Sequence, residues 1–148
     1  MSARILLVED DPFVSRGILT YIQKQNDLSV ELVPTAEDAI AAVRREQWSI
    51  IILDLMLAGF SSGHYLVQAI KHFPDDDRPR VIVITGAPVS EIAKVDRSVA
   101  HAIFFKPLQF DAFAHYVHHL ATAADPSVAV DPAPERIPIS PVTKPKDV

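Results

Sequence analysis

The sequence predicts an α/β domain with a doubly wound, mostly parallel sheet of five strands in the order 2-1-3-4-5 and helices on both faces. Two observations carry this prediction. Apolar segments of strand length alternate strictly with segments of helical periodicity, five of each. Three of the apolar segments, at residues 3–10, 48–56 and 80–86, are almost continuous, as in strands that are covered on both faces. Right-handed crossovers leave few topologies, and this strand order is the compact one.

Each expected strand is an apolar run, and the second, LSVELVP, is the weakest of them. The third strand ends in an acid, and the last ends in a lysine and a proline. In chain order the expected strands cover residues 3–10, 28–34, 48–56, 80–86 and 100–107.

Apolar stripes define the expected helices. Thr35 and Asp38 stand in the spacing of a capping box, which marks the start of the second helix. A polar loop at 75–79 precedes the fourth strand, and the fourth helical segment, PVSEIAKVDRS, is short. The helices are expected at 13–25, 35–47, 61–73, 88–98 and 108–124. Their stripes contain Val14, Ile18, Tyr21 and Ile22 in the first, Ala36, Ile40 and Val43 in the second, and Phe113, Val117 and Leu120 in the last.

The composition indicates where the domain ends. The chain has 148 residues, of which 49% are hydrophobic, which is enough for one soluble domain with a sizeable core. Half of the 12 prolines fall in the last 24 residues. We therefore expect a domain at 1–124 and an extended or disordered tail at 125–148. The tail is either a docking segment or linker, or an end without a role.

Charge and hydropathy exclude several classes of protein. A net charge of -5 without a basic run argues against nucleic-acid binding. The absence of cysteine excludes disulfides and thiolate metal sites. The first apolar run is short and ends in acids, unlike a signal peptide, and no run approaches the ~20 apolar residues that cross a bilayer. We expect a cytoplasmic protein with no membrane contact.

Charged and polar residues stand where the expected strands end. Glu9 and Asp10 close the first strand, Asp54 the third, Thr85 the fourth and Lys106 the fifth. In open parallel sheets ligands bind beyond the carboxyl ends of the strands, at the point where the strand order reverses. Like charges crowded beside a buried strand repel each other and lose solvation. The acids therefore indicate a site with a counter-ion or a reaction.

The residue types at this edge favour phosphoryl chemistry. Oxygen ligands without histidine or cysteine favour Mg²⁺ over zinc, and Mg²⁺ shares its coordination with waters and phosphate oxygens. Lys106 supplies a point charge and Thr85 a hydroxyl. A carboxylate in these surroundings can accept a phosphoryl group as an acyl phosphate.

The motifs VEDD at 8–11, LDLM at 53–56, VITG at 83–86 and FKP at 105–107 together resemble the receiver domain of two-component response regulators. The resemblance covers residues 3–124. Within the family, the sequence resembles stand-alone receivers of the chemotaxis-regulator type. Each motif alone is weak, but all of them in order at strand ends are specific. The order 2-1-3-4-5 is already known for flavodoxin-like domains of this family, so it is no independent result.

The resemblance implies a role for each site residue. Asp54 is the phosphoacceptor, and its carboxylate, with Glu9, Asp10 and the backbone carbonyl of Met56, holds Mg²⁺. Thr85 contacts the phosphoryl group and Lys106 pairs with its oxygens. Two further implications are a cis Lys106–Pro107 bond and a Gly86 that leaves room beside the phosphate.

The chain also departs from the family pattern. Receivers usually carry a proline four residues after the phosphoacceptor and a glycine eight after it. Here Ala58 stands at the first position, and Gly63 comes one position late. Ile103 replaces an aromatic residue three positions before the lysine. These departures concern the loop after Asp54 and the output of the signal, and they leave the acceptor itself intact.

Other polar residues have structural explanations. We expect Asp11 to cap the first helix rather than to bind metal, and Trp48 to pack at the entry to the third strand. Three histidines in the last helix suggest a metal site, but we expect them on its solvated face, with two others also at the surface. The histidines are His115, His118 and His119, and then His64 and His72.

The leading hypothesis is a single-domain response regulator that takes phosphate from a histidine kinase or phosphotransfer protein. It would signal through a downstream protein on the face of 88–98, 100–107 and 108–124. We expect no DNA-binding domain and no enzymatic activity beyond phosphorylation and dephosphorylation of Asp54; a homodimer is left open. The alternatives are a phosphorelay shuttle, an unphosphorylated scaffold and a Mg²⁺-dependent phosphatase. Met56 stands where such a phosphatase would carry its second aspartate.

Overall fold

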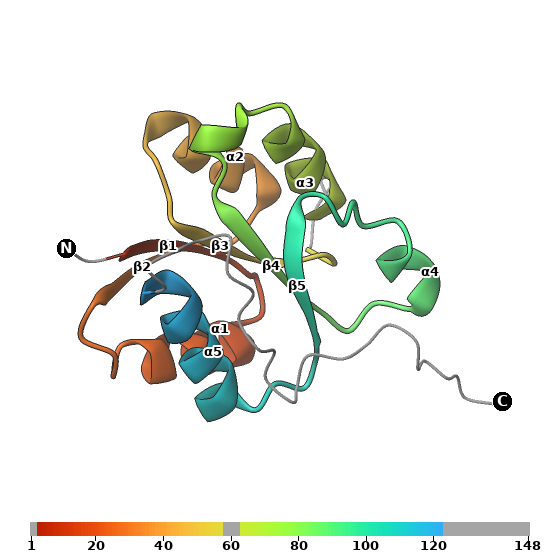
Figure 1. Ribbon diagram of the computed structural model, residues 1–148. Coiled ribbons are helices and arrows are strands. Elements are labelled where there is room, and N and C mark those ends of the chain that lie inside the picture. The colour runs from red at the N-terminus through yellow and green to blue at the C-terminus, as the bar shows by residue number, and fades with distance from the viewer. Residues whose placement is uncertain (1–2, 58–62, 123–148) are drawn as a thin grey trace, which may run out of the picture.

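The computed structural model describes residues 3–57 and 63–122, and these form a five-stranded sheet between two layers of helices (Figure 1). All pairings are parallel, and the strand order is β2-β1-β3-β4-β5. The expected fold class is therefore confirmed. The strands are β1 (Ala3–Val8), β2 (Leu28–Val33), β3 (Ile50–Asp54), β4 (Arg80–Thr85) and β5 (Ala100–Phe105).

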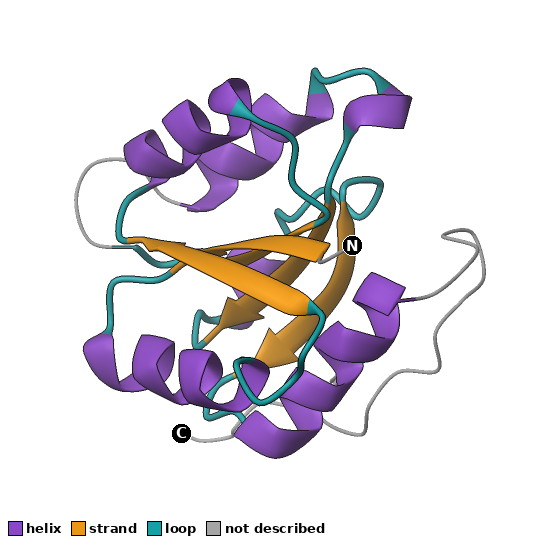
Figure 2. Cartoon of the chain, turned by 90° about the vertical axis from the view of Figure 1, so that its left-hand side faces the viewer, coloured by secondary structure: helices purple, strands orange, loops and turns teal. Residues whose placement is uncertain are grey.

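The helices lie on both faces of the sheet, as a second view of the chain shows (Figure 2). Two of them, α1 and α5, cover one face, and α2, α3 and α4 lie on the other. A single 3₁₀ turn, Asp75–Asp77, lies in the segment expected as a polar loop. The helices are α1 (Pro12–Ile22), α2 (Ala36–Arg45), α3 (Gly63–Lys71), α4 (Val89–Ile92) and α5 (Phe110–Thr122).

The fourth helix is much shorter than the expected segment at 88–98. After Ile92 the backbone bonds span three residues, from Lys94 to Glu91 and from Val95 to Ile92. The carboxylate of Asp96 then accepts hydrogen bonds from the backbone and hydroxyl groups of Ser98. Aspartate often closes a turn in this way, because its side chain competes with the helix for nearby N–H groups.

The core consists of two apolar layers separated by the sheet. Alternate residues of β1 and β3 point to opposite layers, which is the two-residue period of a strand. Residues 5–8 of β1 and all of β3 are buried on both faces, which explains why these stretches, apart from Asp54, are continuous apolar runs. Ile5 and Ile52 belong to the α1–α5 layer, and Leu6 and Leu53 belong to the α2–α3–α4 layer. Asp54 is thus the last residue of a strand that is buried between the two layers.

Two helix starts agree with the sequence. The Asp11 carboxylate accepts hydrogen bonds from the backbone of Phe13 and Val14, and the Thr35 hydroxyl accepts one from Asp38. Asp11 is thus the expected N-cap of α1. None of the helices in the described part of the chain is long and apolar enough to cross a membrane. Ala58 and the expected tail at 125–148 lie outside the described residues.

Candidate functional site

The structure brings the strand-end residues together at one edge of the sheet. Asp54 is the last residue of β3 and Thr85 is the last residue of β4, while Glu9 and Lys106 directly follow β1 and β5. Parallel strands place these carboxyl ends side by side. Glu9, Asp54 and Thr85 are almost completely buried, although they are polar. Buried polar side chains require partners, and the partners define the site.

Lys106 holds the two buried carboxylates together. Its Nζ lies 2.9 Å from Oε1 of Glu9 and 3.0 Å from Oδ2 of Asp54. The ammonium side chain is 19% exposed, whereas the Glu9 side chain is fully covered. The Lys106–Pro107 peptide bond is cis, as expected. One cation therefore bridges residues that are far apart in the sequence, and it neutralises part of the carboxylate charge.

The burial of this group changes its acid–base behaviour. Desolvation raises the pKa of Glu9 to about 7, against the opposing effect of hydrogen bonds from Lys106 and from the backbone of Asp11. Burial by itself would lower the pKa of Lys106, but its hydrogen bonds to Glu9 and Asp54 outweigh burial and raise it. Lys106 is therefore held as a cation, while Glu9 takes up a proton at higher pH than an exposed glutamate.

The carboxylates also form a candidate cation site. Glu9, Asp10 and Asp54 each offer an oxygen, and these oxygens all lie within 4.8 Å of one another. An open pocket of about 440 Å³ adjoins them, and Met56, Gly86 and Lys106 line it together with the two aspartates. Three clustered oxygen donors without nitrogen or sulfur suit a hard divalent ion. The residues present therefore fit a magnesium-type ion.

Of the remaining predicted residues, Met56 and Gly86 line the same pocket, and Thr85 directly precedes Gly86 in the chain. Thr85 is buried, and its Oγ1 accepts a hydrogen bond of 2.8 Å from the backbone of Ala87. The backbone N–H of Met56 donates a 3.0 Å bond to Oδ1 of Asp54, so the loop after β3 orients the carboxylate. Gly86 has open space where a side chain would stand. The roles that the resemblance implies for these residues stay predictions.

Comparison with known proteins gives the family. The model of the response regulator receiver domain matches residues 5–118, which is most of the chain. This chain belongs to the response regulator receiver family. The match takes in all five strands, apart from the first two residues of β1, and all but the end of α5. The receiver fold and the strand-end site therefore fall within it.

Individual relatives of the receiver are distant. The transcriptional regulatory protein ComA of Bacillus subtilis (strain 168) is 25% identical over 120 residues, which are 79% of this chain. These residues are 55% of ComA, so the chain spans about half the length of that relative. ComA therefore shows a related receiver, and what the whole of ComA does remains a property of ComA.

Solved structures agree in fold. The signal receiver domain of a putative LuxO repressor protein from Vibrio parahaemolyticus is 27% identical, with a TM-score of 0.70, and 80% of this chain covers 88% of that one. The phosphorylated cyanobacterial phytochrome response regulator RcpA has a TM-score of 0.74 at 20% identity, with coverages of 84% and 97%. At that identity RcpA supports the fold alone.

Gly63 has a role in the receiver that the sequence did not indicate. A Cβ at this position would lie 2.5 Å from the carbonyl oxygen of Asp54 and 2.7 Å from Cα of Leu55. The Gly63 N–H donates to the carbonyl of Leu55 at 2.9 Å. The start of α3 thus packs directly on the backbone of the expected phosphoacceptor. The only sign of this role in the sequence was that the glycine comes one position later than in the family pattern. The sequence did not show that Gly63 contacts the backbone of Asp54.

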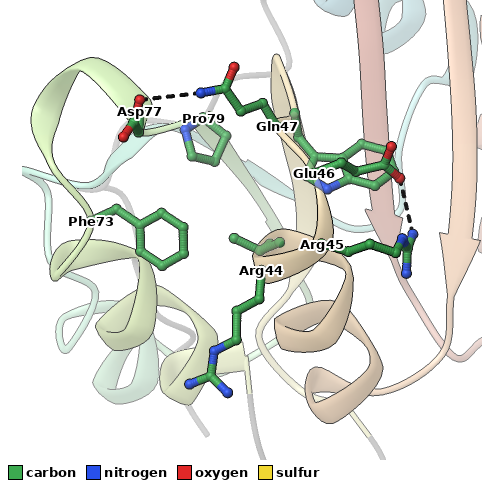
Figure 3. Close-up of a pocket in the computed structure, with 9 residues that line it drawn as sticks. Arg44, Arg45, Glu46, Gln47, Phe73, Asp77 and Pro79 are labelled. Atoms are coloured by element: carbon green, nitrogen blue, oxygen red, sulfur yellow. Dashed lines mark hydrogen bonds and ion pairs between the residues drawn. The ribbon is translucent and has the colours of Figure 1, made fainter.

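A second hollow in the receiver lies at the opposite edge of the sheet. It has a volume of about 280 Å³ and is lined by the end of α2 and the chain that enters β4 (Figure 3). Gln47 donates a 3.2 Å hydrogen bond to Asp77 across it, and Phe73 faces its interior. It lies at the amino ends of the strands, away from Asp54. We assign no role to it.

The tryptophan and the histidines singled out in the sequence lie only partly where they were expected. Trp48 is buried and donates its indole N–H to the carbonyl of Ala42, as a packing residue would. His72 is exposed, whereas His64 is only 22% exposed and lies 3.2 Å from Glu91 of α4. The expected surface position is therefore met only in part by His64, because its ring lies against Glu91. On α5, His118 is half-buried, and the other two histidines are exposed.

Proposed function

We propose that this receiver is a single-domain response regulator that accepts a phosphoryl group on Asp54 from a histidine kinase or phosphotransfer protein. One observation supports this proposal most strongly. Lys106 pairs with Glu9 and Asp54 at 2.9 and 3.0 Å, beside Asp10 and next to an open pocket. The arrangement places a nucleophile, a counter-charge and free space together, which phosphoryl transfer requires.

The described side chains have distinct parts in the proposed transfer. A carboxylate oxygen of Asp54 forms the new bond to phosphorus while the bond to the donor histidine nitrogen breaks, and that nitrogen leaves with the electron pair. Lys106 is close enough to pair with the incoming oxygens, and Thr85 offers a hydroxyl. Mg²⁺, which Glu9, Asp10, Asp54 and the carbonyl of Met56 would hold, neutralises phosphoryl charge when it is bound.

The output is proposed to be phosphorylation-dependent binding of a downstream protein on the face of α4, β5 and α5. The backbone of Ala87, which follows β4, is hydrogen-bonded to Thr85, so a movement of the hydroxyl would act on the chain that leads into α4. We propose no activity on other substrates and no direct DNA binding. A cytoplasmic location and the choice between monomer and homodimer stay predictions.

Two alternative functions, a phosphorelay shuttle and a phosphatase, differ from the proposed one in how long the phosphoryl group stays on Asp54. In a shuttle, phosphate would return rapidly from Asp54 to a histidine protein. In a phosphatase, each molecule would turn over many donors. A time course with a panel of histidine kinases separates these outcomes from lasting acceptance, and absence of labelling supports the unphosphorylated scaffold.

Asp54→Asn provides the direct test. The amide has almost the same volume as the carboxylate but cannot act as the nucleophile. Incubation with a small-molecule phosphodonor and Mg²⁺ should add one phosphoryl group to the wild type, seen by intact-mass analysis, and none to the variant. Label on the variant at the wild-type level would exclude Asp54 as the acceptor. Asp10→Ala should weaken Mg²⁺ binding more than Asp11→Ala, because Asp11 is occupied as a helix cap.

A further inference from the structure

A pair of histidines stands on the outer side of α5. His115 and His119 are both exposed, and Asp111 lies one turn before them on the same side. The opposite side of the helix, with Phe113 and Val117, is buried in the core. The two imidazoles are four residues apart, so they lie one above the other on the helix surface. Because Phe113 and Val117 face the core, the two histidines face outward.

The two rings are already close together. Their centroids lie 5.3 Å apart, and the ring planes are tilted by 39°. Zn–N bonds of about 2.0–2.1 Å place each ring centre roughly 3.2 Å from the metal, so a tetrahedral angle separates two bound rings by about 5.2 Å. The observed spacing therefore matches that of two imidazoles that share one tetrahedral ion.

The surroundings leave both rings available. Within residues 3–57 and 63–122, the structure gives neither ring an ion pair or hydrogen bond, and their contact is with each other. Imidazole nitrogen suits Zn²⁺, Cu²⁺ and Ni²⁺, whereas the carboxylate cluster near Asp54 suits hard ions. Pairs of histidines at this helical spacing are an established way to bind zinc. The two sites thus differ in ligand chemistry as well as in place.

We propose that His115 and His119 form a bidentate site for a borderline divalent transition ion of the zinc type. The other coordination positions are open to water, since both rings are exposed. The site uses neither Asp54 nor phosphate, so its existence does not depend on the proposed phosphorylation. A bound ion adds two positive charges to α5 of a chain with a net charge of -5. It also links two successive turns of that helix.

His118 supplies a matched control on the same helix. It lies next to His119 in sequence, but it is half-buried, and its backbone carbonyl accepts a hydrogen bond from Thr122. If only the described pair binds the ion, His118→Gln leaves the affinity within about twofold. Loss of either paired histidine removes the chelate, in which the second ligand binds intramolecularly, and lowers the affinity by about tenfold or more.

The test is a calorimetric titration of the full chain with ZnCl₂ in a large excess of Mg²⁺, which keeps the acidic cluster from taking up zinc. The wild type, His115→Gln, His119→Gln, the double variant and His118→Gln are compared, with the thermal melt of each metal-free variant as a check of folding. One ion per chain and the affinity losses stated above support the site. Wild-type affinity equal to that of the double variant, or an equal loss in His118→Gln, overturns it.

Discussion

On one face of the sheet, α1 and α5 are joined by aromatic contacts, whereas on the other face α4 and the turn after it contact α3 through polar side-chain pairs, with Ile92 as a buried apolar contact. Phe104 of β5 meets Phe113 and Tyr116 of α5 at centroid distances of 4.9 and 5.2 Å, with the rings edge to face. At the start of α5, Phe110 lies over Gly17 of α1. This layer is closed by apolar surface, which favours a single arrangement.

The contacts of α4 are of a different kind. It is one turn long, and no side chain caps its start. His64 lies 3.2 Å from Glu91, and Lys71 lies 2.8 Å from Asp96 just beyond the helix. Ile92 is its buried apolar anchor. Partly exposed ion pairs contribute little stability, so this segment should open at lower free energy than the α1–α5 layer.

This difference suggests that the two faces of the sheet have different roles, one in positioning the site and the other in transmitting a signal. The α1–α5 layer and the buried strands hold Asp54 and Lys106 in place, while α4 follows Thr85 through a short loop and has Ile92 as its buried residue. Ile103 of β5 is buried and packs in the layer that contains α4. It lacks the aromatic ring that receivers usually carry at this position, so any signal from Thr85 should travel mainly through the loop at 86–88.

The largest expected effect is on the aromatic layer. Phe113→Ala should lower the free energy of unfolding by about 3–5 kcal/mol, because it leaves a cavity in place of a fully buried ring. Phe13→Ala is the matched control, since Phe13 is 75% exposed, and it should cost less than about 0.5 kcal/mol. Urea denaturation of both variants measures the difference. If both variants lost the same unfolding free energy, the burial of each ring would not determine its contribution to stability.

Gly63→Ala should have the next largest effect, at about 1–3 kcal/mol. The added methyl group would meet the backbone of Asp54 and Leu55, which cannot move aside as a flexible side chain can. The same change should slow phosphorylation of Asp54, because it displaces the carboxylate. Gly86→Ala is the control for the stability measurement alone, with open space at the corresponding point. Unfolding curves and phosphodonor labelling follow the two effects, and a fully stable, normally labelled Gly63 variant would contradict the close packing.

Gly17→Ala should cost less, at most about 1 kcal/mol, because the higher helix propensity of alanine offsets part of the clash. A Cβ there would overlap the end of the Phe110 ring, which is only half-buried and can turn outward. In a Phe110→Ala background, the same change should become stabilising by up to about 1 kcal/mol. A double-mutant cycle in urea tests this reversal of sign. If the sign stays the same, the ring is not what opposes the methyl group.

The smallest effect is expected at the ion pair between Lys71 of α3 and Asp96 in the turn after α4. The hydrogen bond from Lys71, together with those from Ser98, lowers the pKa of Asp96. Because the folded-state pKa is below the unfolded one, the contribution is fully present above pH ~4 and is lost only as the pH falls further. Asp96→Asn at neutral pH should therefore speed amide exchange at Ala93 and Val95 while leaving global unfolding nearly unchanged. A large global loss would show that this face is not the weaker one.

Much of this protein follows from its sequence, because the signals are local. The alternation of strands and helices, the Asp11 and Thr35 caps and the acids at strand ends all depend on residues within a few positions of each other. In a parallel sheet the carboxyl ends of the strands must meet at one edge, so the sequence alone predicts that Asp54 and Lys106 lie at the same edge. The histidine spacing on α5 is visible for the same reason.

Only the tertiary structure decided which distant groups touch. The bridge from Lys106 to both Glu9 and Asp54, the contact of Gly63 with the Asp54 backbone and the contact of His64 with α4 each join segments from different crossovers. Such contacts depend on how helices of particular length dock on a twisted sheet. Packing is satisfied over the whole core at once, so no short stretch of sequence specifies its own long-range neighbours.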